Sequence, residues 1–377
     1  MALFQYRVEY GATYATLSTV ADNVQEVFLS YGRRAPLDQY NADTASVTLR
    51  YPNGYATPNA SWVTGTWIKI SGRLAGNVTY KQLWVGRIAD VTVDYGIPYV
   101  DVPMVGYVGN ADYVTLTCEG AFAAFGRVQG EGYAMAANTL GVQTTNASAQ
   151  SGLSVTTNSQ FGDAQLFPAT TIDSTWGDWC NRVALTMNGK IVDIGTSIVL
   201  VNAFYRIPAT FGGFSDTIND ANNHPYNQIS FSSLADNWYT EVTVDPESFP
   251  AATVTSGSAP YRTYLVNTLN ASTSQATDYA NYLLSTYKTQ ALRIFSITVS
   301  LNAQKGDYPS YGQGYLGTQL TVLFRGTTYQ CVIEGGTFSG TPAEGTATFY
   351  LSAQDLNNYL ILDNAVYGKL DNNRLGY

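Results

Sequence analysis

The stretch LWVGRIADVTVD, residues Leu83–Asp94, decides the fold class of this chain. In its second half Asp90 and Asp94 fall on one polar face, whereas Val91 and Val93 are apolar. Strict alternation of polar and apolar side chains is typical of a half-buried β-strand, because successive side chains point to opposite faces of a sheet. The stretch therefore predicts a strand.

The same period of two recurs on both sides of this stretch. Five such segments before residue 120 predict a mainly β fold, with a barrel or sandwich at the N-terminus. Their residues are Phe4–Tyr10, Thr44–Tyr51, Thr66–Ser71, Leu83–Asp94 and Tyr113–Thr117.

Two segments have helical spacing instead. Asp173 or Ser174 can cap a helix that ends at Asn188-Gly189, and Ser272 with Gln275 resembles a capping box for a second helix. Each has apolar residues on one face, which predicts a packing face rather than a ligand-binding one. These residues are Trp176, Trp179, Cys180, Val183, Ala184 and Met187 in the first helix, and Ala276, Tyr279, Ala280, Leu283, Leu284 and Tyr287 in the second.

The rest of the chain divides into further strands and two polar segments. Gly130–Ser159 is rich in small and polar residues and Phe214–Tyr226 in Asn and Asp, so both are expected to be joints or long loops. The further strands are expected at Lys190–Val201, Leu292–Leu301, Gln319–Phe324, Thr328–Glu334 and Thr346–Leu351.

Charged residues make up only 12% of the 377 residues, against about 25% in ordinary globular proteins. Tyr, Gly, Ser, Thr and Asn take their place, with 29 Tyr and 34 Gly. We interpret this as a β protein that hides much of its surface against neighbours. The net charge of −9 argues against tight nucleic-acid binding, which needs clustered cations.

Few residues offer catalytic or metal-binding chemistry. His224 is the single histidine, so the sequence gives little support for a Ser-His-Asp relay or a histidine-based zinc site. Gly312–Gly317 matches a dinucleotide-binding fingerprint by letter, but a strand rather than a helix is expected after it. The cysteines are odd in number and far apart in the sequence, which predicts buried thiols rather than disulfides or a metal site. They are Cys118, Cys180 and Cys331. We expect no enzyme activity, no cofactor and no metal.

The N-terminus alternates like a strand and does not resemble a signal peptide, and no run reaches the ~18 apolar residues of a membrane span. The doublet Arg33-Arg34 is the one basic pair in a chain that is poor in charge. It is either a solvated turn or a contact to carboxylates of a partner, and the scarcity of charge favours contact.

Segments in a characteristic order resemble the minor tail proteins of long-tailed (siphovirus) phages of actinobacteria. The C-terminal signature is the strongest part of the resemblance, and Gly130–Phe214 matches weakly. The matching segments are Ser30–Arg33, Leu37–Tyr40, Thr44–Leu49, Thr57–Asn59, Leu83–Ile88, Tyr113–Cys118, Ala121-Phe122, Ala280–Tyr287 with Arg293-Ile294, Leu360–Asp363, Gly368–Asp371 and Asn373–Tyr377.

The resemblance implies a tail-tip or baseplate hub, present in the virion at the tail tip and made in the host cytoplasm. Such hubs form homotrimers in which each subunit contributes two tail-tube-like barrels, converting sixfold to threefold symmetry around a channel for genome ejection. This predicts a barrel at 1–130, an α/β insert at 131–210, a second barrel with a packed helix at 211–305, and a C-terminal β module at 306–377.

The resemblance also implies the partners and the contact residues. The partners are further copies of the chain, the distal tail or tail tube proteins, the tape measure protein, and other tail-tip or fibre proteins. DNA only passes through the lumen, and no stable membrane insertion is expected. The expected assembly contacts are Arg33, Arg34, Leu360, Ile361, Leu362 and Tyr377.

Three other functions stay open. A distal tail ring protein would form a hexamer with one tube fold per chain. A receptor-binding or cell-wall glycan-binding module would use the many Tyr and Trp side chains to stack on sugar rings. A wall-degrading enzyme has least support, because no catalytic constellation is evident.

Overall fold

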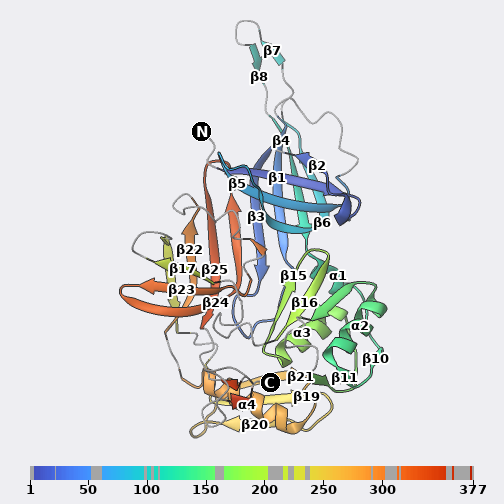
Figure 1. Ribbon diagram of the computed structural model, residues 1–377, viewed down its shortest axis with the longest axis vertical. Coiled ribbons are helices and arrows are strands. Elements are labelled where there is room, and N and C mark those ends of the chain that lie inside the picture. The colour runs from blue at the N-terminus through green and yellow to red at the C-terminus, as the bar shows by residue number, and fades with distance from the viewer. Residues whose placement is uncertain are drawn as a thin grey trace.

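The computed structural model describes most of the chain, and it is mainly β. The described residues are 4–21, 23–51, 62–96, 100–102, 106–108, 111–157, 165–202, 215–219, 225–233, 238–289, 292–301, 312–313, 316–353, 359–360 and 374–375. The molecule is elongated, with the helix α4 (Thr273–Tyr287) at one end and the strands β7 (Val100–Val102) and β8 (Gly106–Val108) at the other (Figure 1).

Thirteen strands form one sheet, in the order β18-β22-β25-β24-β3-β4-β9-β6-β5-β1-β2, with β23 pairing β24 and β17 pairing β23 beside this path. The pairing of the described strands is an open path, so neither expected barrel is closed by hydrogen bonds in this part of the chain. The strands are β1 (Phe4–Gly11), β2 (Thr19–Ala21), β3 (Val24–Gly32), β4 (Thr44–Tyr51), β5 (Trp67–Leu74), β6 (Lys81–Asp94), β9 (Asp112–Glu119), β17 (Ser215–Asn219), β18 (Gln228–Ser232), β22 (Arg293–Ser300), β23 (Gln319–Phe324), β24 (Thr327–Gly340) and β25 (Gly345–Ala353).

All five strands expected before residue 120 are present, and so are the strands expected at 292–301, 319–324, 328–334 and 346–351. The structure adds β3, which had not been expected, and it lies at the centre of the sheet. An irregularity in its pairing between Val24 and Glu26 disturbs the alternation that would have marked it.

The long strand β24 connects the N-terminal strands with those after residue 214. Its first half pairs with β23 and its second half with β3, and the register shifts between Ile333 and Gly335. A β-bulge of this kind bends a strand and allows it to belong to two parts of a sheet. The expected boundary at 305/306 falls between β22 and β23, which both lie in this sheet.

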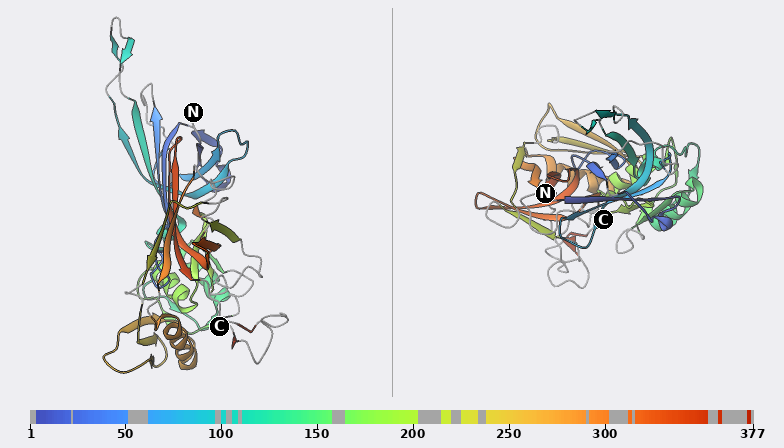
Figure 2. Two further views of the ribbon diagram at one scale, coloured as in Figure 1. Left: turned by 90° about the vertical axis from the view of Figure 1, so that its left-hand side faces the viewer. Right: turned by 90° about the horizontal axis from the view of Figure 1, so that it is seen from above.

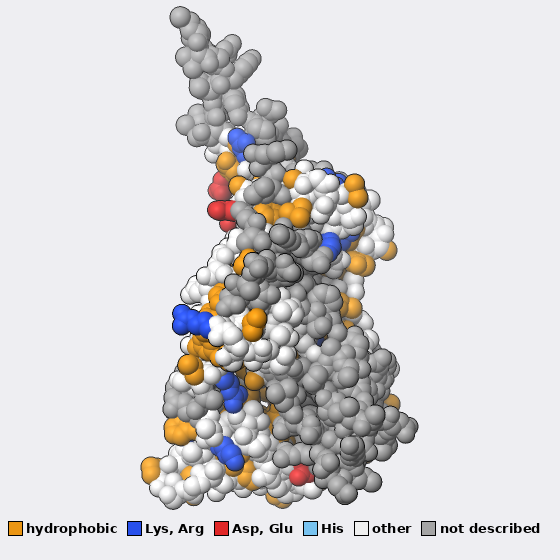
Figure 3. Space-filling model, turned by 60° about the vertical axis from the view of Figure 1, so that its left-hand side comes forward, with side chains coloured by type: hydrophobic (Ala, Val, Ile, Leu, Met, Phe, Trp, Pro, Cys, Tyr) orange, Lys and Arg blue, Asp and Glu red, His pale blue; other side chains and the backbone are white. Residues whose placement is uncertain are grey.

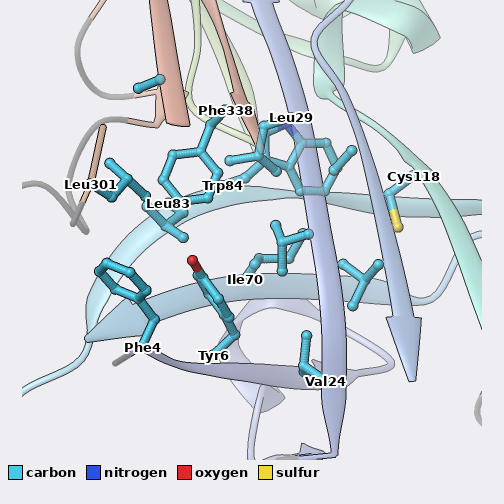
Figure 4. Close-up of a cluster of buried hydrophobic side chains, with 14 of the residues drawn as sticks. Phe4, Tyr6, Val24, Leu29, Ile70, Leu83, Trp84, Cys118, Leu301 and Phe338 are labelled. Atoms are coloured by element: carbon cyan, nitrogen blue, oxygen red, sulfur yellow. The ribbon is translucent and has the colours of Figure 1, made fainter. Parts of the chain in front are cut away.

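The sheet folds over on itself and encloses one apolar core. Phe4 and Tyr6 of β1 point toward Phe338 of β24 and toward Leu301 (Figure 4), and the rings of Tyr6 and Phe338 meet edge to face with centroids 6.2 Å apart. Trp84 is fully buried in the same cluster. Each such side chain contributes about 1.5–3 kcal/mol by leaving water. The outward faces of β1 and β3 consequently point to opposite sides.

A second unit follows β9; it begins with α1, before the residues 131–210 at which an α/β insert is expected. It contains a three-stranded sheet in the order β12-β16-β15 and two short pairs, β10 with β14 and β11 with β13. Its elements are α1 (Ala121–Phe125), β10 (Ala134–Met135), β11 (Asn138–Thr139), α2 (Leu140–Ser151), β12 (Ser154–Thr157), β13 (Leu166–Phe167), β14 (Thr170–Thr171), α3 (Trp176–Thr186), β15 (Lys190–Asp193) and β16 (Ser197–Val201).

Three expectations for this unit need correction. The residue that caps α3 is Thr175, whose Oγ1 accepts a hydrogen bond of 3.2 Å from the backbone N of Asp178. The strand expected at 190–201 is a hairpin of two strands, because the chain turns at Gly195, where φ is +83°. The segment expected to be a loop at 130–159 contains α2.

The third unit is small and lies at the end opposite to β7 and β8 (Figures 1 and 2). The helix α4 covers a three-stranded sheet of β19 (Glu241–Pro246), β20 (Ala252–Thr255) and β21 (Thr263–Thr268). Ser272 caps α4 as expected, and its Oγ accepts from the backbone N of Gln275 at 3.2 Å. The remaining elements are η1 (Tyr14–Thr16), β26 (Tyr359–Leu360) and β27 (Arg374–Leu375).

Candidate assembly site

The two arginines of the expected contact doublet have different surroundings. Arg33 is 4% exposed, whereas Arg34 is exposed and its guanidinium lies 5.5 Å from the ring centroid of Tyr350. Leu360 lies in β26, which pairs in parallel with β27. Ile361, Leu362 and Tyr377 lie outside the described residues.

Arg33 contacts a carboxylate of its own chain. Its Nη2 lies 2.9 Å from Oε2 of Glu334, the residue at the bulge of β24, and Nε donates to the same oxygen at 2.9 Å. Ser352 donates to the other carboxylate oxygen at 2.6 Å. The guanidinium also donates to the carbonyl of Gly189 at 3.2 Å and lies 4.4 Å from the ring centroid of Tyr40. This network joins β3, β24, β25 and the start of β15.

Two buried carboxylates lie beside this network. Asp43 accepts from the backbone N of Gly32 at 3.1 Å and from Nε2 of Gln313 at 2.8 Å. Asp193 accepts from the backbone N of Phe122 at 2.9 Å and of Gly195 at 2.7 Å. Asp43 therefore ties the end of β3 to the segment of Gln313, and Asp193 ties the end of β15 to the start of α1.

Burial raises the pKa of the Asp43 carboxyl well above its ordinary value, and the negative charge of Asp193 raises it further. The hydrogen bonds from Gln313 and Gly32 act in the opposite direction but are the smaller influence. Burial also raises the pKa of Asp193, against the hydrogen bonds that it accepts from Phe122, Gly195 and Ala121. Each carboxyl makes it harder for the other to ionise.

Lys190 completes the cluster, because its Nζ donates to the carbonyl of Leu316 at 3.0 Å although the residue is only 8% exposed. We call Arg33, Asp43, Lys190, Asp193 and Glu334 the buried polar junction. It lies where the large sheet, the insert and the segment before β23 meet. All five residues are buried, so the junction supports the arrangement of these parts and offers no open reaction site.

Four of the five junction residues were not predicted from the sequence. Glu334 is the one charge between Arg325 and Glu344, and Lys190 and Asp193 flank an apolar pair in Lys190–Asp193. An isolated charge inside an apolar strand is the signal that marks a buried ion pair or hydrogen-bonded group.

The fingerprint-like segment and the three cysteines have structural roles. Gln313 of the fingerprint-like segment bonds Asp43, and the strand β23, rather than a helix, follows Gly317. The three cysteines are buried and free, as expected. His224 lies outside the described residues.

Metal ligation and membrane spanning concern the described residues as follows. No group of three or more His, Cys, Asp or Glu side chains in the described part of the chain is placed to hold a metal ion. No helix in the described ranges is both long and apolar enough to cross a membrane.

The outward face of the large sheet is lined with hydroxyl groups and has few charges. One cross-strand row runs from Thr298 through Thr348, Thr337 and Ser30 to Thr44, and the first two hydroxyls are 2.9 Å apart. We call this surface the hydroxyl face. Its members are Ser296, Thr298, Ser300, Thr346, Thr348, Thr337, Ser339, Ser30, Thr44, Ser46 and Thr48.

Charged side chains are also few and scattered on the side of the molecule drawn in Figure 3. An ordinary solvent-facing surface carries roughly 25–35% charged residues. The low overall charge of the chain is thus also seen among the described residues on this side.

No protein-family model matches the sequence, and no curated protein matches it significantly. Solved structures do match. The 43 kDa tail protein of prophage MuSo2 from Shewanella oneidensis aligns with a TM-score of 0.61 and 12% identity, over 93% of this chain and 98% of that chain. A tail protein from Neisseria meningitidis MC58 aligns with a TM-score of 0.56 and 10% identity, over 93% and 96%. The chain thus has a fold that phage tail proteins adopt.

Proposed function

We propose that this chain is a structural protein of a phage tail, and specifically a tail-tip or baseplate hub that forms a homotrimer. The observation that carries the proposal is the match to the MuSo2 tail protein over 93% of one chain and 98% of the other. A match of this extent includes the large sheet, the insert and the small α4 unit together. The likeness therefore concerns the whole arrangement and not one widely shared domain.

The surface chemistry supports a channel. A polyanion that passes a wall should meet neither clustered cations, which would bind it, nor an apolar face, which would bind protein instead. The hydroxyl face has no cluster of cations and is mostly hydroxyl-lined, although Phe28, which is 43% exposed, lies between Ser339 and Ser46. We propose that this face lines the lumen. As a hub, the chain would cap the tail tube, convert sixfold to threefold symmetry and contact the tape measure, distal tail and fibre proteins.

Exposed Ser and Thr are also uncommon at the centre of protein interfaces, where Tyr, Trp, Phe, Met and Arg are enriched. The hydroxyl face is consequently a poor candidate for the contact between subunits. The glycan-binding alternative loses one of its supports, because Trp176 and Trp179 of α3 are each 2% exposed and present no ring for a sugar.

Light scattering on the purified chain and an averaged cryo-EM image of the virion tail test the proposal. We expect a particle of three chains of 40.9 kDa each, and a threefold ring around an axial hole at the tail tip. Six copies around the axis would favour the distal tail ring instead. A monomer that makes no ring contacts in the virion would overturn the proposal.

A further inference from the structure

The outward face of β1, β5 and β6 differs from the rest of the sheet surface, because it concentrates positive charge. Where β1, β5 and the first half of β6 pair, four basic side chains, Arg7, Lys69, Arg73 and Arg87, project outward with one acid, Glu9. Two further acids of β6, Asp90 and Asp94, lie beyond this part, where β6 pairs with β9. In the whole chain the ratio is reversed, with 19 Lys and Arg against 28 Asp and Glu. We call this surface the basic face.

Aromatic rings hold the cations in place. The guanidinium carbons of Arg7 and Arg73 lie 4.2 and 4.3 Å from the ring centroid of the same tyrosine, Tyr80. Arg73 also donates to Oε1 of Gln5 at 2.8 Å. Two like charges on one ring repel each other, so an anion brought to this point would relieve the repulsion.

A second aromatic group lies on the same face. Arg87 covers Trp67 with its guanidinium carbon 4.5 Å from the ring centroid, and Tyr14 meets Trp67 at 6.1 Å with the rings 66° apart. Tyr14 is 44% exposed. Trp, Tyr and Arg are the residue types that dominate binding energy at protein interfaces, because they contribute large rigid contacts at low entropic cost.

We propose that the basic face binds the acidic part of a second copy of this chain. Up to Arg127 there are nine Lys and Arg against ten Asp and Glu, and from Val128 onward there are ten against eighteen, so eight of the nine net negative charges lie in the later part. Exposed acids of that part include Asp173, whose side chain is 78% exposed, and Asp245. The two surfaces are electrostatically complementary between copies.

The geometry of the contact agrees with a ring. Two different surfaces meet, so the contact is heterologous, and repetition of such a contact closes a ring when the rotation allows it. The outer surface of the sheet runs on from the hydroxyl face to the basic face, because Glu119 pairs with both Thr44 and Arg87. The fold-over turns Arg7, Lys69 and Arg73 of β1 and β5 away from the hydroxyl row of β3, β24 and β25, so these three cations are placed toward a different neighbour. This inference rests on the proposed function, because it assigns the contact that holds the ring together.

Nucleic acid is the weaker candidate for this face. DNA binding relies on an extended set of cations that neutralise phosphates. Here Glu9 lies in the middle of the face, with its Oε2 2.5 Å from Nζ of Lys69. An acid at this position repels phosphates but is tolerated at an interface where both partners carry mixed charge.

The test compares the wild type with the double substitution Arg7→Gln and Arg73→Gln. We expect the double variant to raise the dissociation constant of the oligomer about tenfold or more, and added salt to weaken the wild type and not the variant. Arg325→Gln removes an exposed arginine from the turn between β23 and β24 and should leave the dissociation constant unchanged. Circular dichroism verifies that each variant is folded.

A zero-length crosslinker applied to mixed light and heavy-isotope chains gives a second readout. We expect crosslinks between Lys69 of one copy and an acid beyond residue 127 of another. Unchanged assembly of the double variant, with no such crosslinks, would overturn this inference and leave the proposed ring intact. A wild-type chain that stays monomeric would overturn both. Retention of labelled duplex DNA by the wild type and not by the variant would identify a nucleic-acid site instead.

Discussion

Two arginine–carboxylate pairs in this molecule have the same chemistry but opposite surroundings. Arg33 and Glu334 have side chains 2% and 0% exposed and are 301 residues apart in the chain. Arg127 and Glu119 form a two-pronged pair only 8 residues apart, and the Arg127 side chain is 64% exposed. Water and salt screen the second pair, whereas the first is excluded from water. The comparison indicates that burial, and not the pairing itself, decides how much stability is lost when one partner is removed.

The largest effect is expected from Glu334→Ala. The substitution leaves the guanidinium of Arg33 buried without its carboxylate, and loss of one partner of a buried pair costs about 3–5 kcal/mol. Urea unfolding followed by circular dichroism measures the change. We expect a lower midpoint, and failure to fold at 37 °C would agree with it.

The matched control replaces both partners with apolar residues, Arg33→Met together with Glu334→Leu. Removing both charges should recover most of the loss, because no uncompensated charge is then buried. A single variant as stable as the wild type would contradict the role that we assign to this pair.

A smaller effect is expected from Gly120→Ala at the junction. A Cβ at this position would lie 2.2 Å from Oδ2 of Asp193, and three backbone hydrogen bonds prevent that carboxylate from moving away. We expect a loss of about 1–3 kcal/mol in thermal unfolding. Gly126→Ala is the matched control, because its Cβ would meet nothing closer than 3.5 Å and its φ of −66° suits alanine. Equal stability of the two variants would show that the Asp193 carboxylate moves away from the added Cβ at little cost in free energy.

Asp43→Asn should change how stability depends on pH. The raised pKa means that folded Asp43 still holds its proton at pH values where the unfolded chain, with an ordinary value of 3.8, has released it. The free energy of unfolding of the wild type therefore falls as pH rises from about 4 through the folded pKa. The variant has no proton to release at residue 43 and should lose less stability over this range. Parallel curves for the two proteins would contradict the raised pKa.

The smallest effect is expected from Arg127→Ala. An exposed pair contributes about 0–1 kcal/mol, and salt reduces it further. Unfolding curves of the variant and the wild type should nearly coincide at high salt. A loss as large as that of Glu334→Ala would remove the contrast between the two pairs.

The strands of the large sheet were the most predictable part of the molecule. In Phe4–Gly11 and Thr44–Tyr51 the side chains alternate strictly between the core and the outward face, and the sequence shows the same alternation. The helices α3 and α4 were equally evident, because their buried faces are mainly apolar residues at helical spacing.

The helix α2 was missed although its spacing is regular. Its buried residues, Leu140, Gln143, Thr144 and Ala147, follow the helical period, but two of them are polar. Gln143 becomes acceptable in the interior because its Nε2 donates to the carbonyls of Ala136 and Pro168. Those partners are supplied by the tertiary structure, so a pattern of apolar residues does not reveal the helix.

The expected contact doublet shows the same limit. Sequence indicated that Arg33 is important because charge is scarce, but it did not identify Glu334 as the partner. That choice depends on the bulge that bends β24 toward β3.

By itself, the sequence determined the mainly β character of this chain, the two amphipathic helices and the lack of surface charge, because side-chain periodicity and composition are local properties. The tertiary structure decided the order of the strands, the fold-over that separates the hydroxyl face from the basic face, and the placement of five charged residues in one buried junction. These features depend on contacts between residues far apart in the chain, and their free energies arise only when burial excludes water from them.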